Sequence, residues 1–267
     1  MNILRSSFSG SFYPQNATVL SKQVHSYLSK IQKTVHHPKA LIVPHAGYVY
    51  SGQVAAHGYK QLEKESYQTA IILGPSHQIY NSTLAIPVEN AYINPLGTVP
   101  FNESIINDLL ESSLFISDSS PHYQEHSIEV QLPFLQVVQP NINIVPISVG
   151  SLSTDALKQA GKVLSKFITD DTILIISNDL SHFHSLNTAK MIDQKTIDAI
   201  LSMDVDRFIT AYQQRSIECC GFFPIALALA TFENLKSIKA TLLKYDTSAS
   251  TSFDDQRVVG YTSISFC

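Results

Sequence analysis

Short runs of consecutive apolar residues recur along the chain. Each run has four to six residues, is rich in Ile, Leu and Val, and is bounded by Pro, Gly, Ser or Asn. Continuous hydrophobicity of this length is typical of strands covered on both faces, as in α/β proteins. The pattern therefore predicts buried strands over residues 40–43, 69–73, 83–86, 142–147 and 172–176.

Segments with helical periodicity lie between and after these runs. An amphipathic stripe predicts helices over residues 18–31 and 154–167. The nearly all-apolar segment 222–232 predicts a helix buried on all sides. Residues 127–138 are less clear, because Pro133 would kink or split a helix there.

The alternation of strand and helix extends over the whole chain. Residues 257–266 mix β-branched and aromatic side chains, so we expect a last strand that closes the sheet. No linker, low-complexity tract or solenoid repeat interrupts the pattern. The 267 residues lie within the range of one α/β domain. We therefore predict a single domain, 1–267, with a central, mostly parallel or mixed sheet flanked by helices.

Composition excludes several classes of function. Hydrophobic residues make up 44% and charged residues 15% of the chain, and the formal net charge is −4. Without a run of Lys and Arg, no binding of nucleic acid or of an anionic membrane is expected. The cysteines are Cys219, Cys220 and Cys267, an odd number with an adjacent pair, which indicates free thiols. Together with the absence of a signal-peptide pattern, this favours a cytoplasmic location.

An apolar strand followed by a short break and a histidine occurs three times. His45 follows the run 40–43, His77 follows 69–73, and His182 follows 172–176. Loops at the carboxyl ends of neighbouring strands converge in open α/β sheets. The sequence therefore predicts that the three histidines face one cleft.

Other residues could belong to the same cleft. Cys220 precedes the predicted helix 222–232, where the helix dipole would favour the thiolate form. Glu125 and His126 stand together before residues 127–138 and could orient a ligand, accept a proton or cap a helix. His184 competes with His182 for the place facing the cleft. We expect His122 to lie on the surface.

Several blocks of the sequence resemble the Memo family, whose bacterial and archaeal members are called AmmeMemoRadiSam system protein B. The blocks follow one another in the expected order over most of the length. They are Gly10-Ser11-Phe12-Tyr13-Pro14, Pro44-His45-Ala46-Gly47-Tyr48 with Ser51-Gly52, Leu73-Gly74-Pro75-Ser76-His77, Glu125-His126-Ser127-Ile128-Glu129 with Leu132-Pro133-Phe134, Ser177-Asn178-Asp179 to His182, Cys220-Gly221, Pro224-Ile225 and Gly260-Tyr261.

The resemblance implies a fold similar to that of class III extradiol dioxygenases, which bind Fe(II) through two His and one Glu. By this resemblance His45 and His77 match the metal histidines, and Cys220 falls where the carboxylate would be. His182 matches a histidine near the metal that could act as acid or base, and Asp179 matches a pocket residue.

The resemblance also implies a metal cofactor, an activity and partners. Fe(II) is the expected metal, with Cu or Zn as alternatives, because a thiolate ligand broadens the choice of metal. We expect a mononuclear non-haem iron protein with redox or dioxygenase-like chemistry, and His182, Glu125 and Asp179 as catalytic residues. The alternatives are a non-enzymatic peptide- or protein-binding module and a metal-handling protein. The expected partners are an unidentified small molecule or peptide, with a functional link to AMMECR-type and radical SAM proteins.

Overall fold

A computed structural model describes residues 2–267, and its centre is built from the predicted apolar runs. Four of them become strands in the spatial order β2-β9-β3-β8, and neighbouring strands run parallel. Their bounds are β2 (Ala40–Val43), β9 (Thr172–Ser177), β3 (Thr69–Pro75) and β8 (Asn143–Val149). The fifth run becomes β4 (Leu84–Ile86), which is antiparallel to β8.

The central strands belong to a mixed sheet of nine strands within residues 2–267, with the order β10-β12-β2-β9-β3-β8-β4-β7 and β11 paired with β12. The further strands are β7 (Phe115–Ser117), β10 (His182–His184), β11 (Ala240–Thr247) and β12 (Val258–Phe266). The last strand forms as predicted, but it does not close the sheet. It lies inside the sheet because β2 pairs with its C-terminal end on one edge and β11 pairs along the other edge, while β10 pairs with its first residues.

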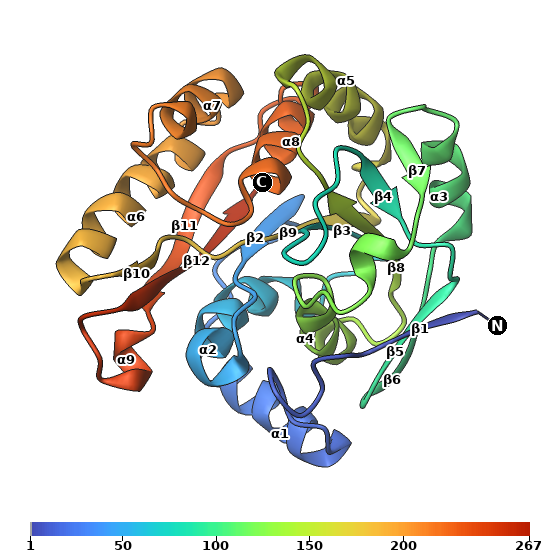
Figure 1. Cartoon of the computed structure of the whole chain (residues 1–267). Helices are drawn as coiled ribbons and strands as arrows, with labels where there is room; N and C mark the ends of the chain where they lie inside the picture. Colours follow the sequence, from blue (N-terminus) through green and yellow to red (C-terminus); the bar gives the residue numbers. More distant parts are fainter. Residues whose placement is uncertain (1) are drawn as a thin grey trace.

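A smaller sheet of three strands lies beside the larger one (Figure 1). It contains β1 (Ile3–Arg5), β5 (Ala91–Asn94) and β6 (Gly97–Pro100). β1 pairs in parallel with β5, which fixes the path of the N-terminal segment before it turns toward the larger sheet. The N-terminal segment, which is far from β5 in sequence, is thereby held close to the carboxyl ends of the parallel strands.

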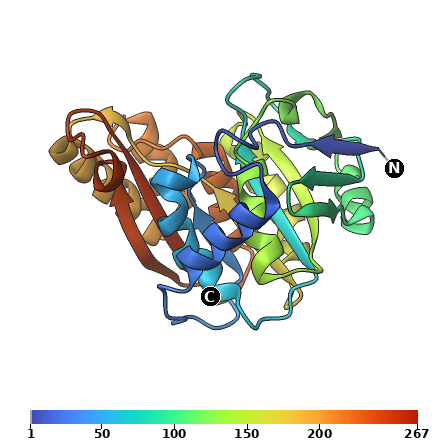
Figure 2. The ribbon, with the colours of Figure 1, turned by 90° about the horizontal axis from the view of Figure 1, so that it is seen from below.

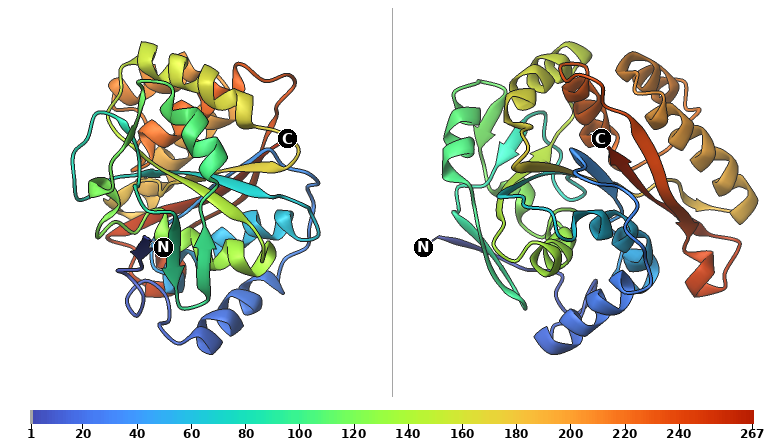
Figure 3. Two further views of the ribbon diagram at one scale, coloured as in Figure 1. Left: turned by 90° about the vertical axis from the view of Figure 1, so that its right-hand side faces the viewer. Right: turned by 180° about the vertical axis from the view of Figure 1, so that it is seen from behind.

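Helices cover both faces of the larger sheet, so the molecule has three layers (Figures 2 and 3). Alternate strand residues point to opposite faces, and both faces are apolar here. Ile42, Ile71 and Ile176 pack against one group of helices, whereas Leu41 and Ile175 pack against the other. This arrangement explains the continuous hydrophobicity of the strands and agrees with the predicted mixed α/β fold.

The first group of helices comprises α3 (Glu103–Leu110), α5 (Thr154–Leu164), α6 (Leu186–Leu201), α7 (Val205–Gln213) and α8 (Phe222–Phe232). The second comprises α1 (Ala17–Leu28), α2 (Tyr48–Tyr59) and α4 (Leu132–Val138). The short α9 (Ala249–Ser252) lies between β11 and β12. No helix within residues 2–267 has both the length and the apolar character needed to cross a bilayer.

Local chemistry sets the helix ends. Asn16 caps α1 by accepting the Val19 amide at 3.1 Å, and Ser153 caps α5 by accepting the Ala156 amide at 3.2 Å. The ambiguous segment 127–138 is split into a 3₁₀ turn, Glu129–Gln131, and α4, with Pro133 in the first turn of the helix. The turn matters for the site, because it follows Glu125 and His126 directly.

Candidate metal site

The carboxyl ends of the central parallel strands carry the first two site histidines. His45 lies two residues after the end of β2, and His77 lies two residues after the end of β3. β9 runs between these strands and leads to Asp179 and His182. Because the strands are parallel, their ends meet at one edge of the sheet, and the side chains converge there.

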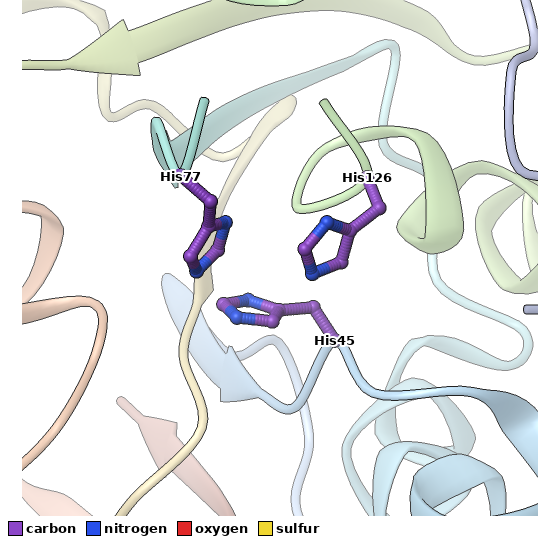
Figure 4. A group of neighbouring side chains, drawn as sticks. All are labelled: His45, His77 and His126. Atoms are coloured by element: carbon purple, nitrogen blue, oxygen red, sulfur yellow. The ribbon is translucent and has the colours of Figure 1, made fainter. Parts of the chain in front are cut away.

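A third histidine, His126, joins His45 and His77 (Figure 4). Each of the three offers a ring nitrogen, and these atoms all lie within 4.8 Å of one another. The ring centroids are 5.1 Å apart for His45 and His77, and 4.6 Å apart for His77 and His126. The three imidazoles thus form a group that could hold one metal ion. His126 was singled out in the sequence only as the neighbour of Glu125.

Glu125 orients His77. Its carboxylate accepts a hydrogen bond from His77 Nδ1 at 2.9 Å and another from the His77 amide at 2.5 Å. Because a carboxylate only accepts, the proton of the neutral ring lies on Nδ1 and the Nε2 lone pair stays free. A metal-binding histidine commonly has such a carboxylate behind it. Glu125 is 4% exposed, whereas the His77 side chain is 30% exposed, so the site opens on this side.

Burial and hydrogen bonding act in opposite directions on this pair. Burial by itself would raise the pKa of Glu125, but the hydrogen bond and charge of His77 and the backbone amides of His77 and Ser127 hold that pKa at about 2. Burial lowers the pKa of His77, but Glu125 outweighs it and the net pKa is raised. Glu125 therefore stays ionised and tied to His77 at any physiological pH.

His45 and Cys220 meet at the other side of the group. His45 Nδ1 lies 2.8 Å from Ser177 Oγ, which leaves Nε2 facing Cys220 Sγ at 3.0 Å. Cys220 directly precedes Gly221, the N-cap of α8. It therefore lies near a helix N-terminus, as the sequence predicts. The sulfur predicted as a metal ligand thus lies beside one of the two predicted metal histidines.

The protein environment favours a protonated Cys220. Burial raises the pKa of its thiol well above the ordinary value, and the charge of Asp179 adds to this effect. The helix dipole, which we expected to favour the thiolate, is outweighed by burial and by the charge of Asp179. A divalent cation at the site would supply the charge needed to release this proton.

Asp179 ties His45 to Cys220. Its Oδ1 accepts the His45 amide at 2.8 Å, and its own amide donates to Cys220 Sγ at 3.1 Å. The Cys220 amide donates in return to the Asp179 carbonyl at 3.1 Å. Asp179 is 3% exposed, and this burial raises the pKa of its carboxyl. It fixes the distance between two potential donors that are 175 residues apart in the chain.

The rings of His45 and His126 are held neutral. Burial and, next, the charge of His77 lower the pKa of His45 well below its ordinary value. Burial and, next, the charge of His45 lower the pKa of His126 to about 4. A neutral imidazole has a free lone pair, which is the form that binds metal ions.

The structure distinguishes His182 from His184. His184 Nε2 lies 2.8 Å from Glu218 Oε2, so its ring is turned toward Glu218. The charge of His182 contributes to lowering the pKa of His45 and of Asp179, so His182 lies near these two residues. In a regular strand these two residues would point to the same face. Phe183 between them has a φ of 62°, and the register of β10 shifts there, so the alternation is broken.

Two phenylalanines of the N-terminal segment form a wall against His126. The Phe12 and Phe8 rings lie 4.6 and 5.3 Å from its ring, centroid to centroid. Glu129 holds their segment in place, because its buried carboxylate accepts the amides of Ser7 at 2.7 Å and Phe8 at 2.9 Å. Glu129 also accepts the hydroxyl groups of two buried tyrosines, Tyr13 and Tyr92.

A cavity of about 190 Å³ lies beside Cys220. Ser76 and Asn81, which follow β3, line one part of it, and Phe222 and Phe223 at the start of α8 line another. The cavity is thus bounded by the same two segments that carry His77 and Cys220. It gives a small molecule room next to the sulfur.

The structure also corrects the expectation for His122 and adds residues that the sequence did not reveal. His122 is buried rather than on the surface, at 4% exposure, because its Nε2 donates to the Ala85 carbonyl at 2.9 Å. Ser177 and Gln131 lie behind His45 and were not singled out as site residues. The place of Ser177 directly after a predicted strand is only a weak indication of a site residue. No feature of the sequence indicates a role for Gln131.

Comparison with known proteins places the chain in a family. A family model described as "Memo-like protein" matches residues 5–265. A "MEMO1 family protein" of Methanosarcina acetivorans is 33% identical over 268 residues, covering 99% of both chains. One of Sulfurisphaera tokodaii is 34% identical over 275 residues, covering 96% of both chains.

A solved structure shows the same fold with little sequence identity. An uncharacterised protein from Escherichia coli K12 superposes with a TM-score of 0.59 at 12% identity, covering 85% of this chain and 98% of that one. With the family match over nearly the whole length and the agreement of the fold, the chain belongs to the Memo family.

Proposed function

We propose that the protein binds one Fe(II) ion through His45, His77 and Cys220 and uses it for redox chemistry on a small molecule. The observation that carries the proposal is the arrangement of free donor atoms. Ser177 and Glu125 engage Nδ1 of His45 and His77, and His45 Nε2 lies 3.0 Å from Cys220 Sγ. Ring nitrogens prepared in this way are typical of metal ligands.

Two distances support a shared ion: the one between Cys220 Sγ and His45 Nε2, and the mutual spacing of the His45, His77 and His126 nitrogens. If an imidazole nitrogen about 2.1 Å and a thiolate about 2.3 Å from an ion make an angle of about 90° there, as in octahedral coordination, they lie about 3.1 Å apart. The sulfur and His45 Nε2 are 3.0 Å apart. Two imidazole nitrogens on opposite sides of an ion would be about 4.2 Å apart. The three histidine nitrogens lie within 4.8 Å, so small side-chain movements bring them to one ion.

Three observations favour a reactive site over a purely structural one. A structural zinc site has four protein ligands and is closed, whereas a catalytic site keeps an open position. Here the His77 side chain is 30% exposed, and a cavity borders Cys220. Two imidazoles and one anion leave coordination positions free, as in non-haem Fe(II) oxygenases, where the metal binds O₂ and substrate.

The other side chains would prepare the substrate. His182, whose charge acts on His45 and Asp179, could take or give a proton, while Glu125 keeps His77 oriented. Phe8 and Phe12 form an apolar wall against His126, which limits access of water from that side. The cavity beside Cys220 would hold the reacting group of the substrate.

Elemental analysis of protein purified without oxygen tests this proposal. We expect close to one equivalent of iron in the wild type and strong loss in His45→Ala and Cys220→Ser variants that remain folded. His25→Ala is the matched control, because His25 is an exposed histidine on α1 whose ring nitrogen Nδ1 is hydrogen-bonded to Ser21 of the same helix. That control should retain the wild-type metal content.

The same measurement separates the two sets of donors. If Cys220→Ser keeps its iron while His126→Ala loses it, the third ligand is His126 and not Cys220. Wild-type protein that binds no metal and melts at the same temperature after Fe(II) addition would contradict the proposal and favour a binding module. Bound iron without O₂ consumption under any reductant would favour metal handling.

A further inference from the structure

We propose that Ser177 is a positioning residue that holds His45 in the tautomer with its proton on Nδ1, and so keeps Nε2 free for a metal. The inference rests on the proposed metal-binding function and extends it to the residues behind His45. Ser177 is the last residue of β9, and its hydroxyl lies 2.8 Å from Nδ1 of the proposed ligand His45.

The polar groups behind His45 form a chain that is closed to water. Tyr59 donates to Gln131 Oε1 at 2.9 Å, Gln131 Nε2 donates to Ser177 Oγ at 2.9 Å, and Ser177 Oγ lies 2.8 Å from His45 Nδ1. These four residues are at most 2% exposed. Each hydrogen of the chain must therefore be placed on a protein partner.

Backbone carbonyl groups fix the orientation of the Gln131 amide. Its Nε2 end lies 3.1 Å from the Pro44 carbonyl and 3.4 Å from the Ser127 carbonyl. Carbonyl oxygens only accept, so the NH₂ group must be at this end. The NH₂ group has two hydrogens, and its two shortest contacts are with Ser177 Oγ at 2.9 Å and the Pro44 carbonyl at 3.1 Å, so the Ser177 oxygen accepts a hydrogen bond from Gln131.

The single hydroxyl hydrogen of Ser177 is also engaged in a hydrogen bond. Its Oγ donates to the Ser127 carbonyl at 2.6 Å, the shortest contact of the chain, and that carbonyl again can only accept. Ser177 thus faces His45 with its remaining lone pair. His45 Nδ1 must carry the hydrogen, and the lone pair of the neutral ring lies on Nε2, toward Cys220 Sγ.

Backbone carbonyl groups fix the direction of the hydrogen bonds behind His45. The direction therefore does not depend on a bound metal ion. The carbonyl groups of Pro44 and Ser127 belong to the segments that carry His45 and His126. The folding of these segments around β9 selects the tautomer before any ion arrives. The ion then meets a prepared donor, and the ring does not have to exchange its proton for binding.

Nitrogen-15 NMR of the metal-free protein, labelled at histidine, tests the assignment directly. We expect the His45 signals, identified by their loss in His45→Ala, to show a protonated Nδ1 and an unprotonated Nε2. In Ser177→Ala the form with the proton on Nε2 should become populated. Ser177→Cys keeps nearly the same size but is a weaker acceptor, so it should give an intermediate result.

Metal affinity provides the second measurement. The apparent Kd for Fe(II), measured without oxygen by competition with a chelating dye, should rise about 10- to 100-fold in Ser177→Ala. The matched control is Ser265→Ala, which removes a buried strand serine whose hydroxyl has no hydrogen-bond partner within residues 2–267. Its tautomer and affinity should equal those of the wild type.

Two results would overturn the inference. One is a wild-type His45 with its proton on Nε2, and the other is a Ser177→Ala protein whose tautomer and Kd are unchanged. Failure of the proposed function looks different: the wild type would take up no Fe(II), while the nitrogen signals of the metal-free protein would still decide the tautomer.

Discussion

At the scale of single residues, hydrogen bonds decide what each histidine of this protein can do. His77 and His45 have Nδ1 engaged by Glu125 and Ser177, whereas His184 has Nε2 engaged by Glu218. The first two keep Nε2 for a ligand, and the third does not. A neighbouring acceptor thus distinguishes residues that look alike in the sequence.

His122 allows a prediction of pH dependence. Burial lowers the pKa of this histidine below its ordinary value of 6.5, so the folded state keeps it neutral. The unfolded chain takes up the proton below pH 6.5, and the stability that depends on neutral His122 is lost as the pH falls toward the folded pKa. His122→Gln, whose amide can still donate to the Ala85 carbonyl, should reduce the loss of unfolding free energy between pH 6.5 and 5.

Urea unfolding at several pH values measures this effect. The slope that His122 contributes is at most about 1.4 kcal/mol per pH unit, the value for one full proton. His25→Gln is the control, because that ring is exposed. If both variants show the slope of the wild type, burial of His122 does not contribute to the acid sensitivity.

At the scale of elements, the N-terminal segment depends on one carboxylate. Glu129 is fully buried and accepts hydrogen bonds from Ser7, Phe8, Tyr13 and Tyr92. The segment places Phe12 against His126 and lets the Phe12 carbonyl accept the Tyr48 amide at 2.8 Å, at the start of α2. A turn, a loop and a helix start are therefore coupled through this residue.

We expect Glu129→Ala to lower the free energy of unfolding by about 3 kcal/mol, since it leaves buried donors without a partner. The segment before Tyr13 should also become sensitive to chymotrypsin, which would cut at Phe8 or Phe12. Glu129→Gln keeps one acceptor oxygen. Its free energy of unfolding and its sensitivity to chymotrypsin should therefore lie between those of the wild type and of Glu129→Ala. Glu111→Ala removes an exposed carboxylate and serves as control. Unchanged proteolysis in Glu129→Ala would show that other contacts hold the segment.

The elements themselves were largely predictable. The five apolar runs all became strands of the larger sheet, and the segment 222–232 became α8 with the same limits. Their apolar character reflects burial on both faces, which local sequence records directly. The place of β12 inside the sheet was not predictable, because pairing with β2 and β11 depends on register and not on local composition.

At the scale of the whole molecule, the site joins distant parts of the chain. His45, His77 and Cys220 come from the ends of β2 and β3 and from the start of α8. An ion bound to all three would cross-link these segments, and it could do so only in the folded state, because folding brings the three side chains together. A ligand that binds only the folded state stabilises it by mass action.

Fe(II) added without oxygen should therefore raise the melting temperature. At a free concentration of 100 times Kd, the gain in unfolding free energy is about 2.7 kcal/mol. His45→Ala should show no such gain, because it lacks the donor next to Cys220. Calorimetry measures both proteins, and an equal shift in the two would mean that the ion binds elsewhere.

The sequence by itself determined the strands that arise from the apolar runs, the last strand, the helices α1, α5 and α8, and the histidines that follow β2 and β3, because burial and the ends of parallel strands leave local patterns. It also indicated Cys220 through its place before an apolar helix. Only the tertiary structure brought His126 to the group, turned the His184 ring toward Glu218, and placed Ser177 behind His45. These contacts join residues distant in the chain, and the hydrogen bonds that fix them depend on orientations that no single segment encodes.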